Sequence, residues 1–158
     1  MNPGQIEPLR LIVIGTAGMG KSYMIKIVQD RLQEIARDHN VDTQSLVLVL
    51  APTGIVAFNI RDVIIHSALS ILISKNDDLE LTGERLKKLQ KNLNGMSYFI
   101  INEKSMVRRR MLALVDMRLC QAFPEYQNQV FKDRSVILVG DFGQLPPVLN
   151  EPMYSQIP

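Results

Sequence analysis

The sequence lacks most of the features that would place it outside ordinary globular proteins. It contains one cysteine and no tryptophan, its formal net charge is +2, and its apolar runs are short. A single cysteine, Cys120, excludes an internal disulfide and a cysteine-rich metal site, and so small a charge gives no general attraction to nucleic acid. A membrane helix would need about 18 consecutive apolar residues. The sequence therefore predicts one soluble domain with an inert thiol and no readable targeting signal.

What the sequence does contain is an alternation of strand and helix signals. Four runs are apolar almost throughout, which is typical of parallel strands covered on both faces. The predicted strands are Leu9–Ile14, Leu46–Leu50, Ser97–Ile101 and Ser135–Val139. Helical spacing of apolar residues predicts a short helix after Thr53 and longer ones over Lys21–Arg37, Glu84–Leu93 and Met111–Cys120. The predicted fold class is α/β.

One glycine-rich segment joins the first predicted strand to the first predicted helix. Its eight residues fit the pattern G-x-x-x-x-G-K-[ST], and they are Gly15, Thr16, Ala17, Gly18, Met19, Gly20, Lys21 and Ser22. In such a loop the backbone N–H groups surround a polyphosphate, the lysine reaches the β- and γ-phosphates, and the hydroxyl ligates Mg²⁺. The alternative is a merely glycine-rich turn. The strand before the segment and the helix after it favour the phosphate-binding interpretation.

Polar residues at the ends of two other predicted strands would complete such a site. Asn102 and Glu103 follow the third strand, where a P-loop ATPase usually has an aspartate and then a glutamate. Asn102 keeps the shape of the metal-side residue but lacks its charge, and loss of an outer metal partner weakens binding about 10- to 100-fold. Glu103 is placed to orient or deprotonate an attacking water, unless it is an ordinary solvated acid. After the fourth strand, Gln144 is placed to sense a γ-phosphate, whereas Asp141 could simply cap a turn.

Four segments in this order resemble the motifs of one family. They are Gly15–Ser22, Ala51–Gly54 with Ile65–Ser67 downstream, Asn102–Met106 and Gly140–Val148. Together they are similar to motifs of the petite-integration-frequency (PIF) DNA helicases, which are RecD-like members of helicase superfamily one. The resemblance covers nearly the whole chain. It implies a P-loop NTPase fold, the RecA-like three-layer sandwich with a mostly parallel sheet, and ATP hydrolysis with Mg²⁺.

The resemblance also implies a biological setting and residue roles. Family members move 5′ to 3′ on single-stranded DNA in repair, recombination and telomere maintenance, which implies an intracellular, nuclear or mitochondrial location. Lys21 would bind phosphate and act in catalysis, Glu103 would be the catalytic acid or base, and Gln144 would link the γ-phosphate to DNA movement. Ser22, Asn102 and Glu103 would hold the metal ion. DNA contacts are expected at Pro52, Thr53, Gly54 and His66.

Physical chemistry supports these DNA contacts unevenly. A hydroxyl and free amides at a strand-to-helix turn suit a backbone phosphate. His66, taken without the resemblance, would more simply be a core or helix-cap histidine.

Several positions depart from the family pattern. Asn102 replaces an aspartate, and Met19 replaces a threonine at a position that contributes mainly its backbone. Arg108 and Lys132–Asp133 stand where glycines are usual, and Arg61–Asp62 lies in a stretch that commonly contains glycine. If those glycines served a positive φ, each replacement costs about 1 kcal/mol or more. Such changes at functional turns predict a decayed or divergent copy of the family's motor.

Residues 1–158 are predicted to be the first RecA-like motor domain, with the second domain and its arginine finger missing. An arginine finger is worth about 10³- to 10⁵-fold in turnover, so we expect this chain to bind ATP and single-stranded DNA with impaired hydrolysis and without unwinding. Two alternatives stay open. One is a noncatalytic relic that binds DNA or a partner. The other is a P-loop phosphotransferase acting on a small molecule, against which the Gly140–Val148 segment argues.

Overall fold

The computed structural model describes residues 7–39, 46–54, 62–71, 80–125, 130–141 and 143. The strands are β1 (Arg10–Ile14), β2 (Val47–Ala51), β3 (Val63–Ile64), β4 (Tyr98–Ile101) and β5 (Ser135–Gly140). The α-helices are α1 (Lys21–Asp38), α3 (Ile65–Ala68), α4 (Gly83–Leu93) and α5 (Arg109–Ala122), and the short 3₁₀ helices are η1 (Lys104–Met106) and η2 (Val130–Asp133). The four predicted strands and the three long predicted helices are confirmed within two residues at each end. Most of the helix expected after Thr53 lies outside the described residues.

The five strands form one sheet in the order β1-β5-β4-β2-β3, and every pair is parallel. All carboxyl ends therefore lie at one edge, as parallel pairing requires. β5 lies between the strand that enters the glycine-rich loop and the strand that ends before Asn102. The sequence did not predict β3, because a strand of two residues leaves no apolar run. It pairs with the end of β2, so that Leu50 is opposite Val63.

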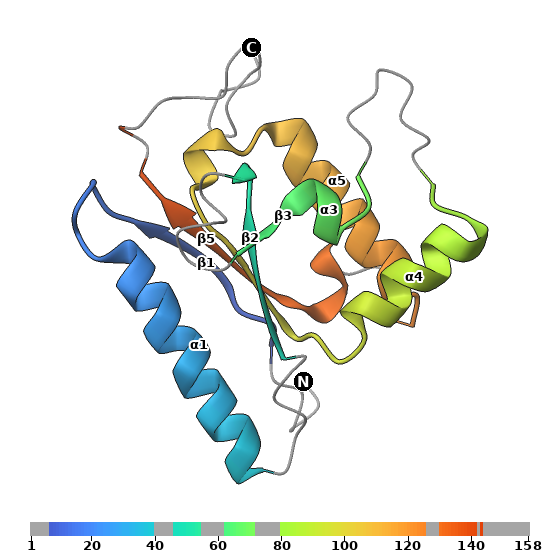
Figure 1. The fold of residues 1–158 in the computed structure, drawn as a ribbon, viewed down its shortest axis with the longest axis horizontal. Helices are drawn as coiled ribbons and strands as arrows, with labels where there is room; N and C mark the ends of the chain where they lie inside the picture. Colours follow the sequence, from blue (N-terminus) through green and yellow to red (C-terminus); the bar gives the residue numbers. More distant parts are fainter. Residues whose placement is uncertain are drawn as a thin grey trace.

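Helices cover both faces of this sheet, and Figure 1 shows α1 on one side with α3, α4 and α5 on the other. On the first side Ile25 of α1 packs in one cluster with Ile100 of β4. On the second side Leu89 of α4 and Leu119 of α5 pack with Phe99. Neighbouring residues of β4 thus enter opposite cores, because side chains alternate along a strand. The predicted three-layer sandwich is confirmed.

The turns where glycines are usual in the family behave in two ways. Lys132 and Asp133 have φ values of 48° and 59°, so the strain expected from missing glycines is confirmed there. Arg108 has a φ of −78°, and Asp62 is not among the described residues with a positive φ. The prediction of backbone strain is therefore wrong at these two positions, because any residue adopts a negative φ without penalty.

Candidate functional site

The glycine-rich loop connects β1 to α1 as predicted. Gly18 and Gly20 both have a φ of 78°, which glycine adopts without a steric penalty. The backbone N–H of Gly15 donates to the carbonyl of Gly140 over 3.1 Å, which ties the loop to the end of β5. The Lys21 ammonium donates to the carbonyls of Gly15 and Thr16 over 2.8 and 3.0 Å. The backbone of the loop thus binds the ammonium group of Lys21, the lysine of the same motif.

The start of α1 suits an anion. The first N–H groups of a helix have no partner within it and carry partial positive charge. No side chain caps α1, and its first turn contains no acidic residue. Ser22 and the loop residues Thr16 to Gly20 are exposed, including the Met19 side chain at 73%. A phosphate group can therefore reach the helix N-terminus, the hydroxyl and the lysine together.

The end of β4 lies against the end of β5 at the same edge. A Cβ atom added at Gly140 would lie 2.8 Å from the backbone nitrogen of Lys104, so this glycine permits the close approach. Glu103, between Asn102 and Lys104, has a left-handed φ of 53°. A non-glycine residue in this region costs of order 1–3 kcal/mol and persists only when its surroundings hold it there. The Asn102 side chain does so, because its Oδ1 accepts the Glu103 N–H over 3.0 Å.

The other half of the Asn102 amide makes a contact that the sequence did not predict. Its Nδ2 donates to Oδ2 of Asp62 over 3.2 Å, although the two residues are 40 positions apart. Both side chains are buried, with 3% of Asn102 and 9% of Asp62 exposed. Burial raises the pKa of the Asp62 carboxyl, and the hydrogen bond from Asn102 opposes this. In the sequence, Asp62 differs from the family pattern only by lying in a stretch that commonly contains glycine. No local pattern predicts that Asn102 is its partner.

Two of the predicted DNA segments meet beside β3. Pro52, Thr53 and Gly54 follow β2, and His66 lies on α3 directly after β3. A Cβ atom at Gly54 would be 3.6 Å from the side chain of Ile64, so the two segments are in contact. The pKa of His66 is lowered, first by burial and then by the positive charge of Arg108. His66 is therefore a half-buried, neutral imidazole at neutral pH, not a cation.

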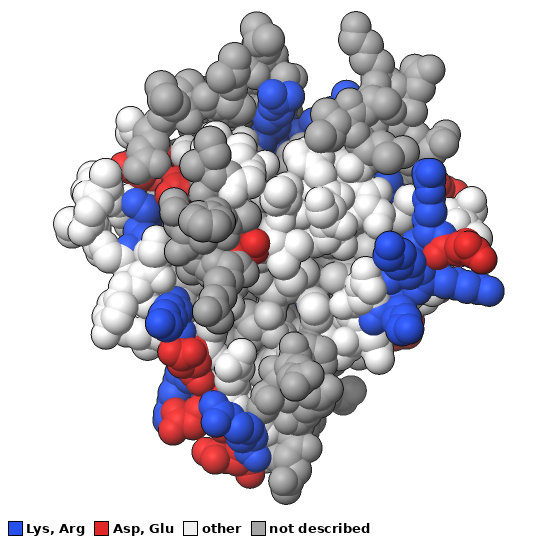
Figure 2. Space-filling view, viewed as in Figure 1, with Lys and Arg blue, Asp and Glu red and all other residues white. Residues whose placement is uncertain are grey.

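Three consecutive arginines lie at the N-terminal end of α5, where Arg108 is the N-cap and Arg109 and Arg110 are the first two residues of the helix. Arg108 and Arg110 are exposed and Arg109 is half-buried. Figure 2 shows basic side chains over the start of α5 and a further group over α4. Arg109 and Arg110 are not among the predicted DNA contacts, although a run of three arginines in the sequence indicates a local basic patch.

The remaining predicted residues can be placed only in part. Asp141 is 8% exposed, and its Oδ1 accepts the Gly143 N–H over 2.8 Å, which is the turn-capping alternative. Gln144 lies outside the described residues. Burial raises the pKa of the half-buried Cys120 thiol, in line with an inert cysteine. No described helix combines the length and apolar character needed to cross a membrane.

Comparison with known proteins decides the family. The family model described as PIF1-like helicase matches residues 5–157. The chain belongs to the PIF1-like helicase family. This membership agrees with the motif resemblance and counts against a small-molecule phosphotransferase.

Individual relatives are larger than this chain. It is 30% identical over 144 residues to ATP-dependent DNA helicase Pif1 of Campylobacter jejuni, covering 87% of this chain and 29% of the relative. The corresponding helicase of Saccharomyces cerevisiae is 31% identical over 140 residues, covering 87% and 15%. The crystal structure of Pif1 helicase from Bacteroides in complex with ADP-AlF3 and single-stranded DNA superposes with a TM-score of 0.67 at 30% identity. That match covers 95% of this chain and 32% of the other, so the chain spans less than a third of these relatives.

Proposed function

We propose that this chain is the ATP-binding half of a PIF-type DNA helicase motor. The observation that carries the proposal is the loop around Lys21, whose ammonium already donates to two carbonyls of a glycine-rich turn at an uncapped helix start. On ATP binding, the Lys21 ammonium would exchange its two carbonyl acceptors for phosphate oxygens. A phosphate carries full negative charge, whereas a carbonyl oxygen carries only a partial charge, and the stronger Coulomb attraction to the ammonium favours that exchange.

The residues around the phosphates fit the expected metal ion in their chemistry. Mg²⁺ prefers oxygen ligands and would screen the charge of the phosphates. Ser22 offers a hydroxyl beside them, and Asn102 and Glu103 lie at the end of β4. Glu103 would orient or deprotonate the attacking water from the turn in which its own φ is 53°. Gln144 is proposed to sense the γ-phosphate.

Single-stranded DNA is the proposed second ligand, on the surface formed by Pro52, Thr53, Gly54 and His66. Thr53 would donate its hydroxyl to a backbone phosphate, and His66 would act as a neutral hydrogen-bonding side chain. The arginines at the start of α5 would add the local positive charge that the chain lacks overall. Movement 5′ to 3′ and unwinding are proposed to require a second RecA-like domain, because a motor closes two domains on ATP.

An equilibrium titration with a fluorescent ATP analogue tests the nucleotide site. We expect Lys21→Ala to weaken binding at least about tenfold, or about 1.4 kcal/mol. Lys26→Ala, which removes an exposed lysine of α1, is the matched control and should bind as the parent chain does. Equal affinity in the parent chain and in Lys21→Ala would exclude this loop as the phosphate site.

A second candidate is a noncatalytic member that binds nucleotide or DNA without turnover. It is favoured by the Asn102 amide, because both of its polar atoms are hydrogen-bonded within the protein. ATP turnover with and without single-stranded DNA separates the two candidates. Turnover at background in the parent chain, in Asn102→Asp and in the double variant Asp62→Asn/Asn102→Asp would support the noncatalytic member.

A further inference from the structure

The metal-side charge that Asn102 lacks is present close by. The carboxylate of Asp62 lies within 3.2 Å of the Asn102 amide. We infer that Asp62 supplies the carboxylate for the divalent cation of the bound nucleotide, with Asn102 holding that carboxylate in place. The negative charge would then lie at residue 62 instead of residue 102. This inference rests on the proposed nucleotide site.

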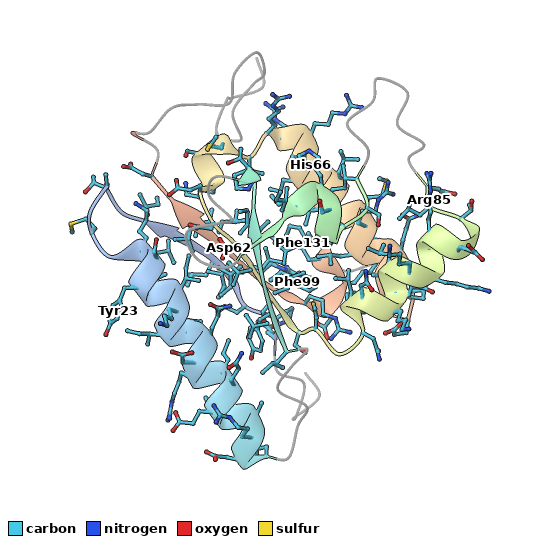
Figure 3. All side chains as sticks on the ribbon, in the orientation of Figure 1. Tyr23, Asp62, His66, Arg85, Phe99 and Phe131 are labelled. Atoms are coloured by element: carbon cyan, nitrogen blue, oxygen red, sulfur yellow. The ribbon has the colours of Figure 1, made fainter. Side chains whose placement is uncertain are left out.

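Strand register puts both residues on the face of the sheet that α1 covers. Ile100 of β4 packs with α1, so alternation places Asn102 on the same face. Val63 is opposite Leu50, and the residue before it is thus level with Val49, which also packs with α1. Figure 3 shows Asp62 on the α1 side of the strands, opposite to His66 and Phe99. Ser22, the cation's other expected protein ligand, lies in the first turn of α1 and so on the same side of the sheet.

One oxygen of Asp62 is left without a partner. Its Oδ2 accepts from Asn102, but its Oδ1 is inaccessible to solvent and has no hydrogen-bond donor among the described residues. A buried carboxylate oxygen normally has a donor or a cation, because its desolvation is otherwise uncompensated. A divalent cation would compensate this oxygen, and because the oxygen is closed to water here, the Asp62 side chain would have to turn toward the cation when the nucleotide binds.

The same geometry predicts that the cation binds only together with the nucleotide. No group of three or more His, Cys, Asp or Glu side chains in the described part of the chain is arranged to hold a metal ion. Phosphate oxygens must therefore provide much of the coordination, as is usual for Mg²⁺ in nucleotide sites. The competing explanation is that the bond between Asn102 and Asp62 only fastens β3 to β4.

A charge-exchange series distinguishes the two explanations. The proteins are the parent chain, Asp62→Asn, the exchanged variant Asp62→Asn/Asn102→Asp, and Asp38→Asn as a control that removes an exposed carboxylate at the end of α1. Fluorescent ADP is titrated into each in EDTA and again in Mg²⁺, and electron paramagnetic resonance counts bound Mn²⁺ with and without ADP. Thermal unfolding checks that each variant is folded. Asp62→Ser replaces Asp62→Asn if the latter does not fold.

We expect Asp62→Asn to bind ADP in EDTA like the parent chain and to lose about 10- to 100-fold of the tightening by Mg²⁺. The exchanged variant should regain that tightening and its ADP-dependent Mn²⁺, and Asp38→Asn should retain both. A folded Asp62→Asn that keeps the full effect of Mg²⁺, or an exchanged variant that stays as weak as Asp62→Asn, would overturn the inference. Absence of ADP binding to the parent chain in either medium would instead reject the nucleotide site itself.

Discussion

Gly140 and Lys104 approach so closely that residue 140 has no space for a side chain. A Cβ atom there would lie 2.8 Å from both the Cγ and the backbone nitrogen of Lys104. The side chain of Lys104 can move, but its backbone follows Glu103 directly and is held by η1. The contact between these two residues therefore sets how near the Glu103 turn lies to the end of β5.

We expect Gly140→Ala to lower the free energy of unfolding by about 1–3 kcal/mol, the usual cost of overpacking. Denaturant unfolding measures this change. Gly54→Ala is the matched control, because its Cβ would be 3.6 Å from Ile64, an ordinary contact. If both variants were equally stable, the contact at Gly140 would not be as tight as described.

Lys132 offers the opposite test, because its φ of 48° strains a non-glycine residue. We expect Lys132→Gly to raise the free energy of unfolding by up to about 1 kcal/mol, since glycine adopts this angle freely. Lys88→Gly within α4 should instead lower it by about 1 kcal/mol. Denaturant unfolding measures both changes. If Lys132→Gly lowered the free energy of unfolding as much as Lys88→Gly does, residue 132 would not have a left-handed φ.

His66 should make the stability of the fold depend on pH. Burial and Arg108 lower its folded-state pKa below the ordinary value of 6.5, so below about pH 6.5 the unfolded state binds more protons than the folded state. The free energy of unfolding should therefore fall as the pH drops through this range and gain nothing from His66 above it.

His66→Gln should flatten this slope when thermal unfolding is followed between pH 5 and pH 8. His39→Gln, at the exposed end of α1, is the matched control and should keep it. The same slope in all three proteins would place His66 in a more open environment.

Much of the fold was predictable because its signals are local. Runs such as Ser135–Val139 must be buried on both faces, and apolar spacing marks α1 and α4 almost to the residue. At α5 the apolar pattern starts at Met111, whereas the helix begins at Arg109, because arginine favours helix without marking a buried face.

The candidate site was predictable in its loop but not in its charges. The spacing of Gly15, Lys21 and Ser22 is a local pattern, and its place between strand and helix is confirmed. The contact between Asp62 and Asn102 depends on the pairing of β3 with β2. No apolar run in the sequence predicts this pairing, because β3 has only two residues. The individual roles in ATP and DNA binding stay predictions.

DNA binding provides a test that separates charge from hydrogen bonding. We expect Arg110→Gln to lower the slope of log affinity against log salt by about 0.7, the value for one phosphate contact on a single strand. Thr53→Ala should weaken binding at every salt concentration and leave the slope unchanged. Lys88→Gln, which removes an exposed cation from α4, should change neither quantity if the basic face of α4 is only solvated. Fluorescence anisotropy with a labelled oligonucleotide measures all four proteins, and a slope unaffected by Arg110→Gln would remove the start of α5 from the DNA surface.

The pair of Asp62 and Asn102 also predicts a stability change that needs no ligand. In the parent chain the Nδ2 group of Asn102 donates to Oδ2 of Asp62 over 3.2 Å. Asn102→Asp would replace this donor with a second carboxylate at the same place. Two buried carboxylates cannot both stay ionised without cost, and a buried acceptor that loses its donor costs about 1–3 kcal/mol. We therefore expect Asn102→Asp to lower the free energy of unfolding in EDTA by about that amount. Adding Asp62→Asn should restore the free energy of unfolding, because one donor then faces one carboxylate again.

Asn94→Asp at the exposed end of α4 controls for the added charge. A double variant no more stable than Asn102→Asp would show that the side chains of residues 62 and 102 do not act as a pair.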